Sequence, residues 1–178
     1  RKDKIGKSES FQSGRFKGVC KQGGTEINLR EYRSEDCPRL IELFWDSVHG
    51  AACRDYTPAQ LDAWAPREMD GERWARTFSH HRTFVVEEGN EIWGFATLDG
   101  DYFDHLFVSS TAQRRGVATA LADRVEQTAK EQGFSRISVH ASLTARPFFE
   151  KRGYRMLKQQ QVERFGERLT NFVMEKDL

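Results

Sequence analysis

Three short segments rich in β-branched and aromatic residues follow one another between residues 83 and 108, and tight-turn dipeptides separate them. Gly89-Asn90 stands between the first and second segments, and Asp99-Gly100 stands between the second and third. Two-residue turns of this kind join neighbouring antiparallel strands. The sequence therefore predicts a meander of three antiparallel strands, whose apolar faces other elements of the chain must cover.

Helical and strand-like periodicities on either side extend the meander into a larger mixed sheet. The predicted strands are residues 26–32, 83–87, 92–98, 102–108, 137–140, 154–163 and 168–175. The predicted helices are residues 34–48, 58–65, 72–79, 112–132 and 145–152. Thr57-Pro58-Ala59-Gln60 marks one helix start clearly, because it combines a capping box with proline at the first helical position. The fold class predicted is α/β of the α+β type, with a mixed, mostly antiparallel central sheet of about seven strands flanked by helices.

The length of 178 residues suits one compact domain, which we place at residues 25–178. Residues 1–24 are basic and poor in apolar residues, and we expect them to form a flexible tail. The formal net charge of +1 gives no reason to expect nucleic acid or an anionic membrane as the main partner. No apolar run approaches the ~20 residues of a membrane helix, and the basic start lacks the apolar core of a signal peptide.

Three cysteines, Cys20, Cys37 and Cys53, stand far apart and form no C-x-x-C pair. That spacing supports neither a zinc knuckle nor a disulfide framework. The chain also lacks an H-E-x-x-H motif and a paired-carboxylate spacing. We therefore expect reduced thiols, no metal and a cytoplasmic location.

The turn after the third meander strand has the features of a phosphate site. A helix opening at Gln113 presents N–H groups that have no acceptor within the helix, and the helix dipole adds partial positive charge. Gly116 has no Cβ to obstruct an anion, and Arg114 and Arg115 supply positive charge. Neither a P-loop nor a G-x-G-x-x-G pattern is present. The residues alone predict a generic anion site.

Two motifs together resemble the GNAT superfamily of N-acetyltransferases. The family's Q/R-x-x-G-x-G/A signature reads Gln113-x-x-Gly116-x-Ala118 here. Its second block, roughly N-x-x-A-x-x-F-Y-x-x-x-G-F, is matched by SLTARPFFEKRGY at residues 142–154. Both occur in the family's element order, and the similarity covers residues 26–176.

The resemblance implies that acetyl-CoA binds as co-substrate between two splayed strands, one ending at Val108 and the other at residues 137–140. The first strand would pair with the pantetheine arm, and an N–H near Val108 would bond the thioester oxygen as it gains negative charge. Residues 114–119 would line the pyrophosphate. The implied cofactor-binding residues are Leu106, Phe107, Val108, Gln113, Arg114, Arg115, Gly116, Val117, Ala118, Thr119, Ser142 and Phe149.

The chain departs from the family pattern at two positions. Ser142 replaces an Asn, although its shorter side chain can still bond the pantetheine arm. Phe149 replaces the Tyr often proposed as general acid and has no proton to give. Either another group protonates the leaving thiol, or none is needed, because alkyl thiols ionise at roughly 8.5. Tyr154 keeps a hydroxyl, but its position corresponds to a packing aromatic.

The attacking amine must lose a proton, since an ammonium has no lone pair. In the resemblance this task falls to a carboxylate on the strand leading into the cleft, and Asp104 and His105 are the candidates. Because strand side chains alternate, at most one of them is expected to face the cleft. With Ser142 they form the predicted catalytic set. Tyr56 and Trp64 are the predicted substrate contacts.

The hypothesis that follows is an N-acetyltransferase that moves the acetyl group of acetyl-CoA to a primary amine of a small molecule or peptide. The alternative is a non-catalytic acyl-CoA sensor or interaction module, and Phe149 is the residue that motivates it. The acceptor, the general base and the choice between monomer and homodimer stay open at this level.

Overall fold

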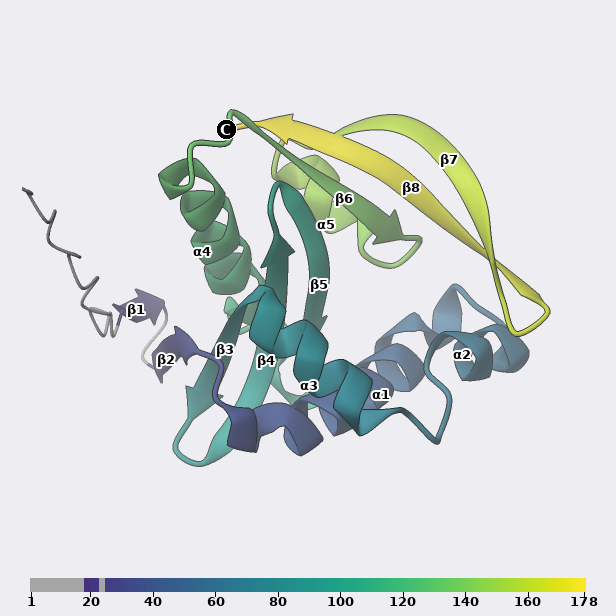
Figure 1. The fold of residues 1–178 in the computed structure, drawn as a ribbon, viewed down its shortest axis with the longest axis horizontal. Helices are drawn as coiled ribbons and strands as arrows, with labels where there is room; N and C mark the ends of the chain where they lie inside the picture. Colours follow the sequence, from purple (N-terminus) through teal and green to yellow (C-terminus); the bar gives the residue numbers. More distant parts are fainter. Residues whose placement is uncertain (1–17, 23–24) are drawn as a thin grey trace, which may run out of the picture.

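The computed structural model describes residues 18–22 and 25–178, and predictions for residues 1–17 and 23–24 lie outside these ranges. One sheet of eight strands runs in the order β1-β2-β3-β4-β5-β6-β8-β7 (Figure 1). The strands are β1 (Gly18–Gln22), β2 (Thr25–Glu31), β3 (Arg82–Glu88), β4 (Glu91–Asp99), β5 (Tyr102–Val108), β6 (Arg136–Ser142), β7 (Arg155–Arg164) and β8 (Glu167–Asp177). The helices are α1 (Cys37–Ala51), α2 (Pro58–Trp64), α3 (Gly71–His80), α4 (Val117–Glu131) and α5 (Arg146–Lys151), with single 3-10 turns η1 (Ser34–Asp36), η2 (Ala52–Arg54) and η3 (Ser110–Ala112).

The predicted meander is confirmed as β3, β4 and β5, all antiparallel. The mixed sheet is confirmed too, because β5 and β6 are the one parallel pair among the described strands. The strand count differs from the predicted seven. The additional strand is β1, which lies within the predicted tail and pairs antiparallel with β2. Gly23-Gly24 between them is a two-residue hairpin signal, and an edge strand requires little apolar patterning to be recruited.

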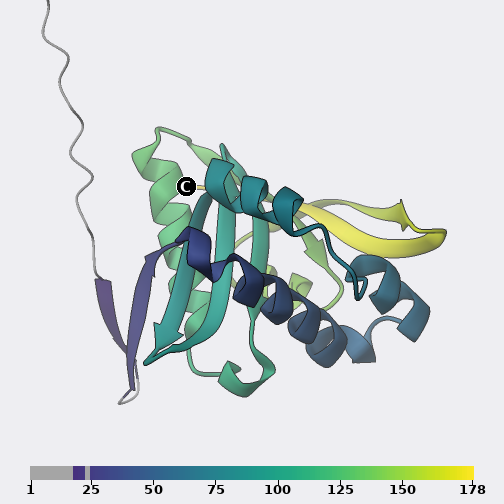
Figure 2. The same ribbon diagram turned by 60° about the horizontal axis from the view of Figure 1, so that its bottom comes forward.

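Helices cover both faces of the sheet (Figures 1 and 2). On one face α1 and α3 bury Leu40, Phe44 and Phe78 against Val85 and Phe95. On the other face, the apolar side of α4 packs against alternate residues of β3 and β4. The described α4 residues in that core are Val117, Leu121, Ala122, Val125 and Ala129, at the three-to-four-residue spacing of one helix face. Among the described helices, none is long and apolar enough to cross a membrane.

Helix starts show where local signals succeed and fail. The capping box of α2 is confirmed, because Thr57 Oγ1 accepts from Gln60 N at 3.2 Å and Gln60 Oε1 accepts from Thr57 N at 2.9 Å. The predicted start of the first helix at residue 34 was wrong, because α1 begins at Cys37. A 3-10 turn precedes that helix, and Asp36 accepts from Arg33 N at 2.8 Å while Arg30 holds it by an ion pair at 2.7 Å. The residue that caps α1 is therefore held by a partner on the preceding strand.

The close contact between α4 and β4 depends on Gly94. A Cβ there would lie 2.8 Å from Val117 Cγ1 and 2.9 Å from the carbonyl oxygen of Phe107, and the latter is a backbone atom that no rotamer change can move. We expect Gly94→Ala to lower the free energy of unfolding by about 1–3 kcal/mol, as overpacked cores do. Urea denaturation measures this loss. A midpoint equal to that of the unmodified protein would contradict the packing described.

Candidate active site

The sheet splits between β5 and β6. These strands pair only at Tyr102 with Ser138 and Phe103 with Val139, although β5 continues to Val108 and β6 to Ser142. The splayed geometry implied by the resemblance is therefore confirmed. Beyond Phe103, one edge of β5 has no strand beside it among the described residues, and its backbone groups are free to pair with an extended ligand.

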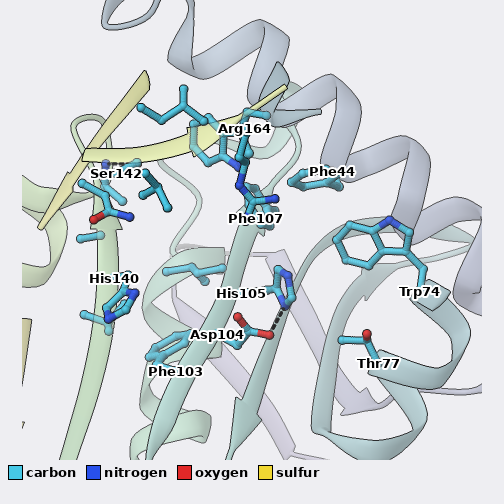
Figure 3. Close-up of a pocket in the computed structure, with 18 of the residues that line it drawn as sticks. Phe44, Trp74, Thr77, Phe103, Asp104, His105, Phe107, His140, Ser142 and Arg164 are labelled. Atoms are coloured by element: carbon cyan, nitrogen blue, oxygen red, sulfur yellow. Dashed lines mark hydrogen bonds and ion pairs between the residues drawn. The ribbon is translucent and has the colours of Figure 1, made fainter. Parts of the chain in front are cut away.

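A cavity of about 650 Å³ opens over this split, between helices α1 to α3 and the β7–β8 hairpin (Figure 3). Its size is that of an ordinary small-molecule site. Eight of the predicted site residues line it: Tyr56, Trp64, Asp104, His105, Leu106, Phe107, Ser142 and Phe149. Val108 and residues 113–119 do not line it. Val108 is the last residue of β5, and residues 113–119 lie around the start of α4.

Asp104 and His105 both line the cavity, so the expectation that only one would face it was wrong. The cause is a β-bulge. In the β4–β5 ladder, Thr97 pairs with His105 and Leu98 pairs with Phe103, which leaves Asp104 without an opposite residue. A bulge breaks side-chain alternation and is common beside active sites. It brings Asp104 Oδ2 within 3.1 Å of His105 Nδ1.

His81, the residue that ends α3, joins this pair from another element. Its Nδ1 lies 3.4 Å from Asp104 Oδ2, and its Nε2 lies 3.5 Å from Asp99 Oδ2. We call His81, Asp104 and His105 the proton cluster. Their ligand-type atoms lie within 4.8 Å of one another and could also hold a cation, so the absence of a metal stays a prediction.

The charge state of Asp104 follows from its neighbours. Burial by itself would raise the pKa of this carboxyl, but the hydrogen bond from His105 and the positive fields of His105, His81 and Arg164 outweigh burial. The net pKa of Asp104 is below its usual range. Asp104 is therefore a carboxylate at neutral pH, suited to attract an ammonium and to orient an imidazole. Thr97 Oγ1, 2.8 Å from His105 Nδ1, fixes the same ring from β4.

Ser142, at the end of β6, and Asn171, within β8, differ in their polar contacts. Ser142 Oγ accepts from Ala145 N at 3.0 Å, which uses its oxygen to shape the turn into α5. Asn171 stands directly opposite Ser142 in the β6–β8 register and lines the cavity. Asn171 Oδ1 is buried and has no hydrogen-bond partner among the described residues. Leaving a buried acceptor unpaired costs about 1–3 kcal/mol, so the atom is prepared for a donor.

Two tyrosine hydroxyls, those of Tyr56 and Tyr154, are already engaged. Tyr56 donates to the carbonyl of Thr170 at 2.8 Å and accepts from Leu143 N at 2.9 Å, so it ties the β6–α5 loop to β8. Burial raises its pKa. Tyr154 lies in the core and donates to Glu126 at 3.2 Å, in agreement with its predicted packing role. Phe149 is buried between Phe103 and Tyr154 and presents only carbon to the cavity.

The helix at the predicted anion site begins later than expected. Residues 113–116 form a turn, and α4 starts at Val117 rather than at Ala112. Arg114 and Gly116 have positive φ values of 63° and 79°, which end the preceding turn sharply and make Gly116 the N-cap. No side chain caps the helix, and the first helical bond runs from Ala120 N to the Gly116 carbonyl at 2.9 Å. The N–H groups of residues 117–119 therefore lack intrahelical acceptors.

Positive charge is held beside this turn. The guanidinium carbon of Arg115 lies 4.7 Å from the centre of the Trp93 ring, a cation–π contact that anchors the side chain on β4. Arg114 and Gln113 are exposed next to it. Left-handed backbone at Arg114 and Gly116, directly before a helix, favours a concave set of N–H donors suited to phosphate. We call residues 113–119 the cradle.

A sequence profile described as acetyltransferase (GNAT) domain matches residues 52–177, which include the cavity, β5 and the cradle. The chain belongs to the GNAT family and is an acetyltransferase. A relative described as uncharacterized N-acetyltransferase YafP, from Escherichia coli strain K12, is 36% identical over 148 residues, covering 83% of this chain and 94% of YafP.

Solved GNAT structures share the fold. A GCN5-related N-acetyltransferase from Rhodopseudomonas palustris has a TM-score of 0.82 at 34% identity, over 84% of this chain and 94% of that one. The PaiA N-acetyltransferase of Thermoplasma acidophilum, solved in complex with coenzyme A, has a TM-score of 0.69 at 15% identity, over 85% of this chain and 99% of that one. At that identity the likeness concerns the fold alone.

Among the cavity residues that the sequence reasoning missed are His81, Asn171 and Arg164. All three lie outside both motifs. No local pattern distinguishes these polar residues from solvated ones. Only the pairing of β6 with β8 and the packing of α3 against the sheet bring them to the cavity.

Proposed function

We propose that this GNAT enzyme transfers the acetyl group of acetyl-CoA to a primary amine of a small molecule or peptide by direct attack of the amine. The observation that carries the proposal is the arrangement along β5. Asp104 and His105 of the proton cluster lie in the middle of this strand, the residues after Phe103 border the split in the sheet, and the C-terminal end of the strand leads into the cradle. Candidate proton acceptors, a free strand edge for the pantetheine arm and a phosphate site thus follow one another along β5 and the turn after it.

Acetyl-CoA fits the groups that the structure leaves unpaired. The pyrophosphate would accept from the N–H groups at the start of α4, with Arg114 and Arg115 beside it. The pantetheine arm would lie along β5 at Leu106, Phe107 and Val108. We assign to Asn171 the contact that the family pattern gives to an Asn at position 142, since an amide N–H of that arm would satisfy its buried Oδ1.

The proton cluster would prepare the nucleophile. Asp104, as a carboxylate, attracts the ammonium form of the acceptor and orients His105. The ammonium loses one proton to bulk water before it attacks, and the imidazole of His105 takes the second proton as the nitrogen–carbon bond forms. The nitrogen lone pair forms the new bond to the carbonyl carbon, and the carbon–sulfur bond breaks. The sulfur leaves as a thiolate in this proposal, because Phe149 stands at the position of the family's general acid and offers no proton, and the hydroxyls of Tyr56 and Tyr154 are engaged.

Titration calorimetry with acetyl-CoA tests the first half of this proposal, and release of free thiol with a panel of amines tests the second. We expect saturable binding and amine-dependent thiol release that is insensitive to a chelator. The non-catalytic sensor suggested by Phe149 would bind acetyl-CoA without releasing thiol. Absence of binding at hundreds of micromolar would refute both functions.

A further inference from the structure

One side of the cavity is an aromatic wall, which we define as Phe44, Trp64, Trp74 and Phe107. The Phe44 ring centroid lies 5.0 Å from that of Trp74 and 4.8 Å from that of Phe107. Trp64 and Phe107 lie 6.3 Å apart. Trp64, Trp74 and Phe107 are only half-buried, and all four residues line the cavity. Ring surface left open inside a pocket favours a flat apolar group as its occupant.

The wall leads directly to the proton cluster. The ring of Trp74 stands 5.2 Å from that of His105, and the ring of Phe107 stands 6.1 Å from it. An acceptor whose body lies on the wall would therefore present a nearby amine to His105 and Asp104. The reacting nitrogen and the apolar body of the acceptor must then be separated by only a short linker.

Arg164, the last residue of β7, projects into the same cavity from the hairpin (Figure 3). Among the described residues it forms no ion pair, not even with Glu167, its partner in the β7–β8 register. Arg30, Arg136, Arg152 and Arg155, by contrast, each hold a carboxylate. A guanidinium that lines a cavity without an ion-paired carboxylate is a fork-shaped receptor that matches an anionic group of a ligand.

Charged side chains of both signs line the cavity. On one side lie exposed Glu68, Asp70 and Arg73, where the side chain of Asp70 accepts from the N–H of Arg73 to cap α3. On β5 and β7 lie the half-buried Asp104 and the exposed Arg164, which have opposite sign. A ligand that carries an ammonium and an anion complements this pair, whereas a diamine would place a second cation near Arg164.

We propose that the acceptor is an aromatic amino carboxylate: its amine at Asp104 and His105, its ring on the aromatic wall and its carboxylate on Arg164. This proposal rests on the proposed acetyl transfer and narrows its substrate class. It assigns Arg164 as the specificity-determining residue. The carboxylate contact holds the acceptor without taking part in the transfer of the proton.

The experiment compares kcat/KM for L-phenylalanine with that for 2-phenylethylamine, which has the same ring and amine but no carboxylate. We expect the unmodified enzyme to prefer the amino acid. Arg164→Gln should lower that preference about 10- to 100-fold, the range of a lost hydrogen-bonded charge contact, chiefly through KM. Arg164→Lys should restore part of it, because a point charge replaces the fork.

Arg168→Gln is the matched control. Arg168 lies on the same hairpin and is exposed, but it does not line the cavity, so the same change of charge there should leave the preference unaltered. An unchanged preference in Arg164→Gln would overturn the proposal, and so would a preference of the unmodified enzyme for 1,5-diaminopentane. In both cases amine acetylation would still be observed, so the transferase function would stand. Absence of thiol release with every amine would instead refute that function and this inference with it.

Discussion

Replacing Asp104 by asparagine is expected to lower kcat/KM for amine acetylation by about 10²- to 10⁴-fold, the usual contribution of a positioned proton acceptor. The neutral amide can neither attract the ammonium nor hold the His105 ring by the 3.1 Å contact at Nδ1. The affinity for acetyl-CoA should stay within about twofold, because the cradle lies after the C-terminal end of β5, away from Asp104. Steady-state thiol release and calorimetry separate these two quantities.

Asp101→Asn serves as the control for this substitution. Asp101 lies three residues earlier and is exposed, and its carbonyl rather than its carboxylate contacts β6. His105→Gln should cause a loss of the same order as Asp104→Asn. The double variant should lose little more, since groups that act as one unit are not additive. Fully additive losses would contradict a coupled pair.

The pH dependence of the reaction adds a second readout. Because the pKa of Asp104 is held below its usual range, titration of this carboxyl cannot produce a loss of activity near neutral pH. The pH profile of kcat/KM near neutral pH should therefore have the same shape in the unmodified enzyme and in Asp104→Asn. A decline near neutral pH that is present in the unmodified enzyme and absent from Asp104→Asn would contradict the low pKa of this carboxyl.

Gly116→Ala is expected to weaken acetyl-CoA binding about tenfold, and Gly116→Val about 100-fold or more. Gly116 caps α4 with a φ of 79°, so a side chain there strains the backbone that aims the free N–H groups. Each charge-assisted hydrogen bond that is lost removes roughly 1.5–3 kcal/mol of binding free energy. Titration calorimetry on each variant measures the change in dissociation constant.

The same helix provides a control with matched backbone strain. Gly133 lies beyond the opposite end of α4 with a φ of 87°, and a Cβ there would meet no atom within 4 Å. Gly133→Ala should cost about 1 kcal/mol of stability, as Gly116→Ala does, without changing the affinity for acetyl-CoA. Equal affinity losses in both variants would show that strain in α4, and not the cradle, is responsible.

Much of the fold could be read along the chain. The three meander strands, the capped start of α2 and the helix ending before Gly133 each depend on residues that are neighbours in sequence. Turn dipeptides, capping boxes and apolar periodicity act through short-range sterics and hydrogen bonds. The predicted start of a helix was wrong where a residue on another element holds the helix start. Asp36, before α1, forms an ion pair with Arg30 of β2.

The candidate site divides along the same line. The sequence by itself determined the cradle and the strand that leads to it, because both are continuous stretches of chain whose backbone would make the proposed contacts. Only the tertiary structure decided that Asp104 and His105 share a face, since that depends on a bulge in the β4–β5 register. The meeting of His81, Asn171 and Arg164 at one cavity likewise required packing between elements, which local sequence rules do not encode.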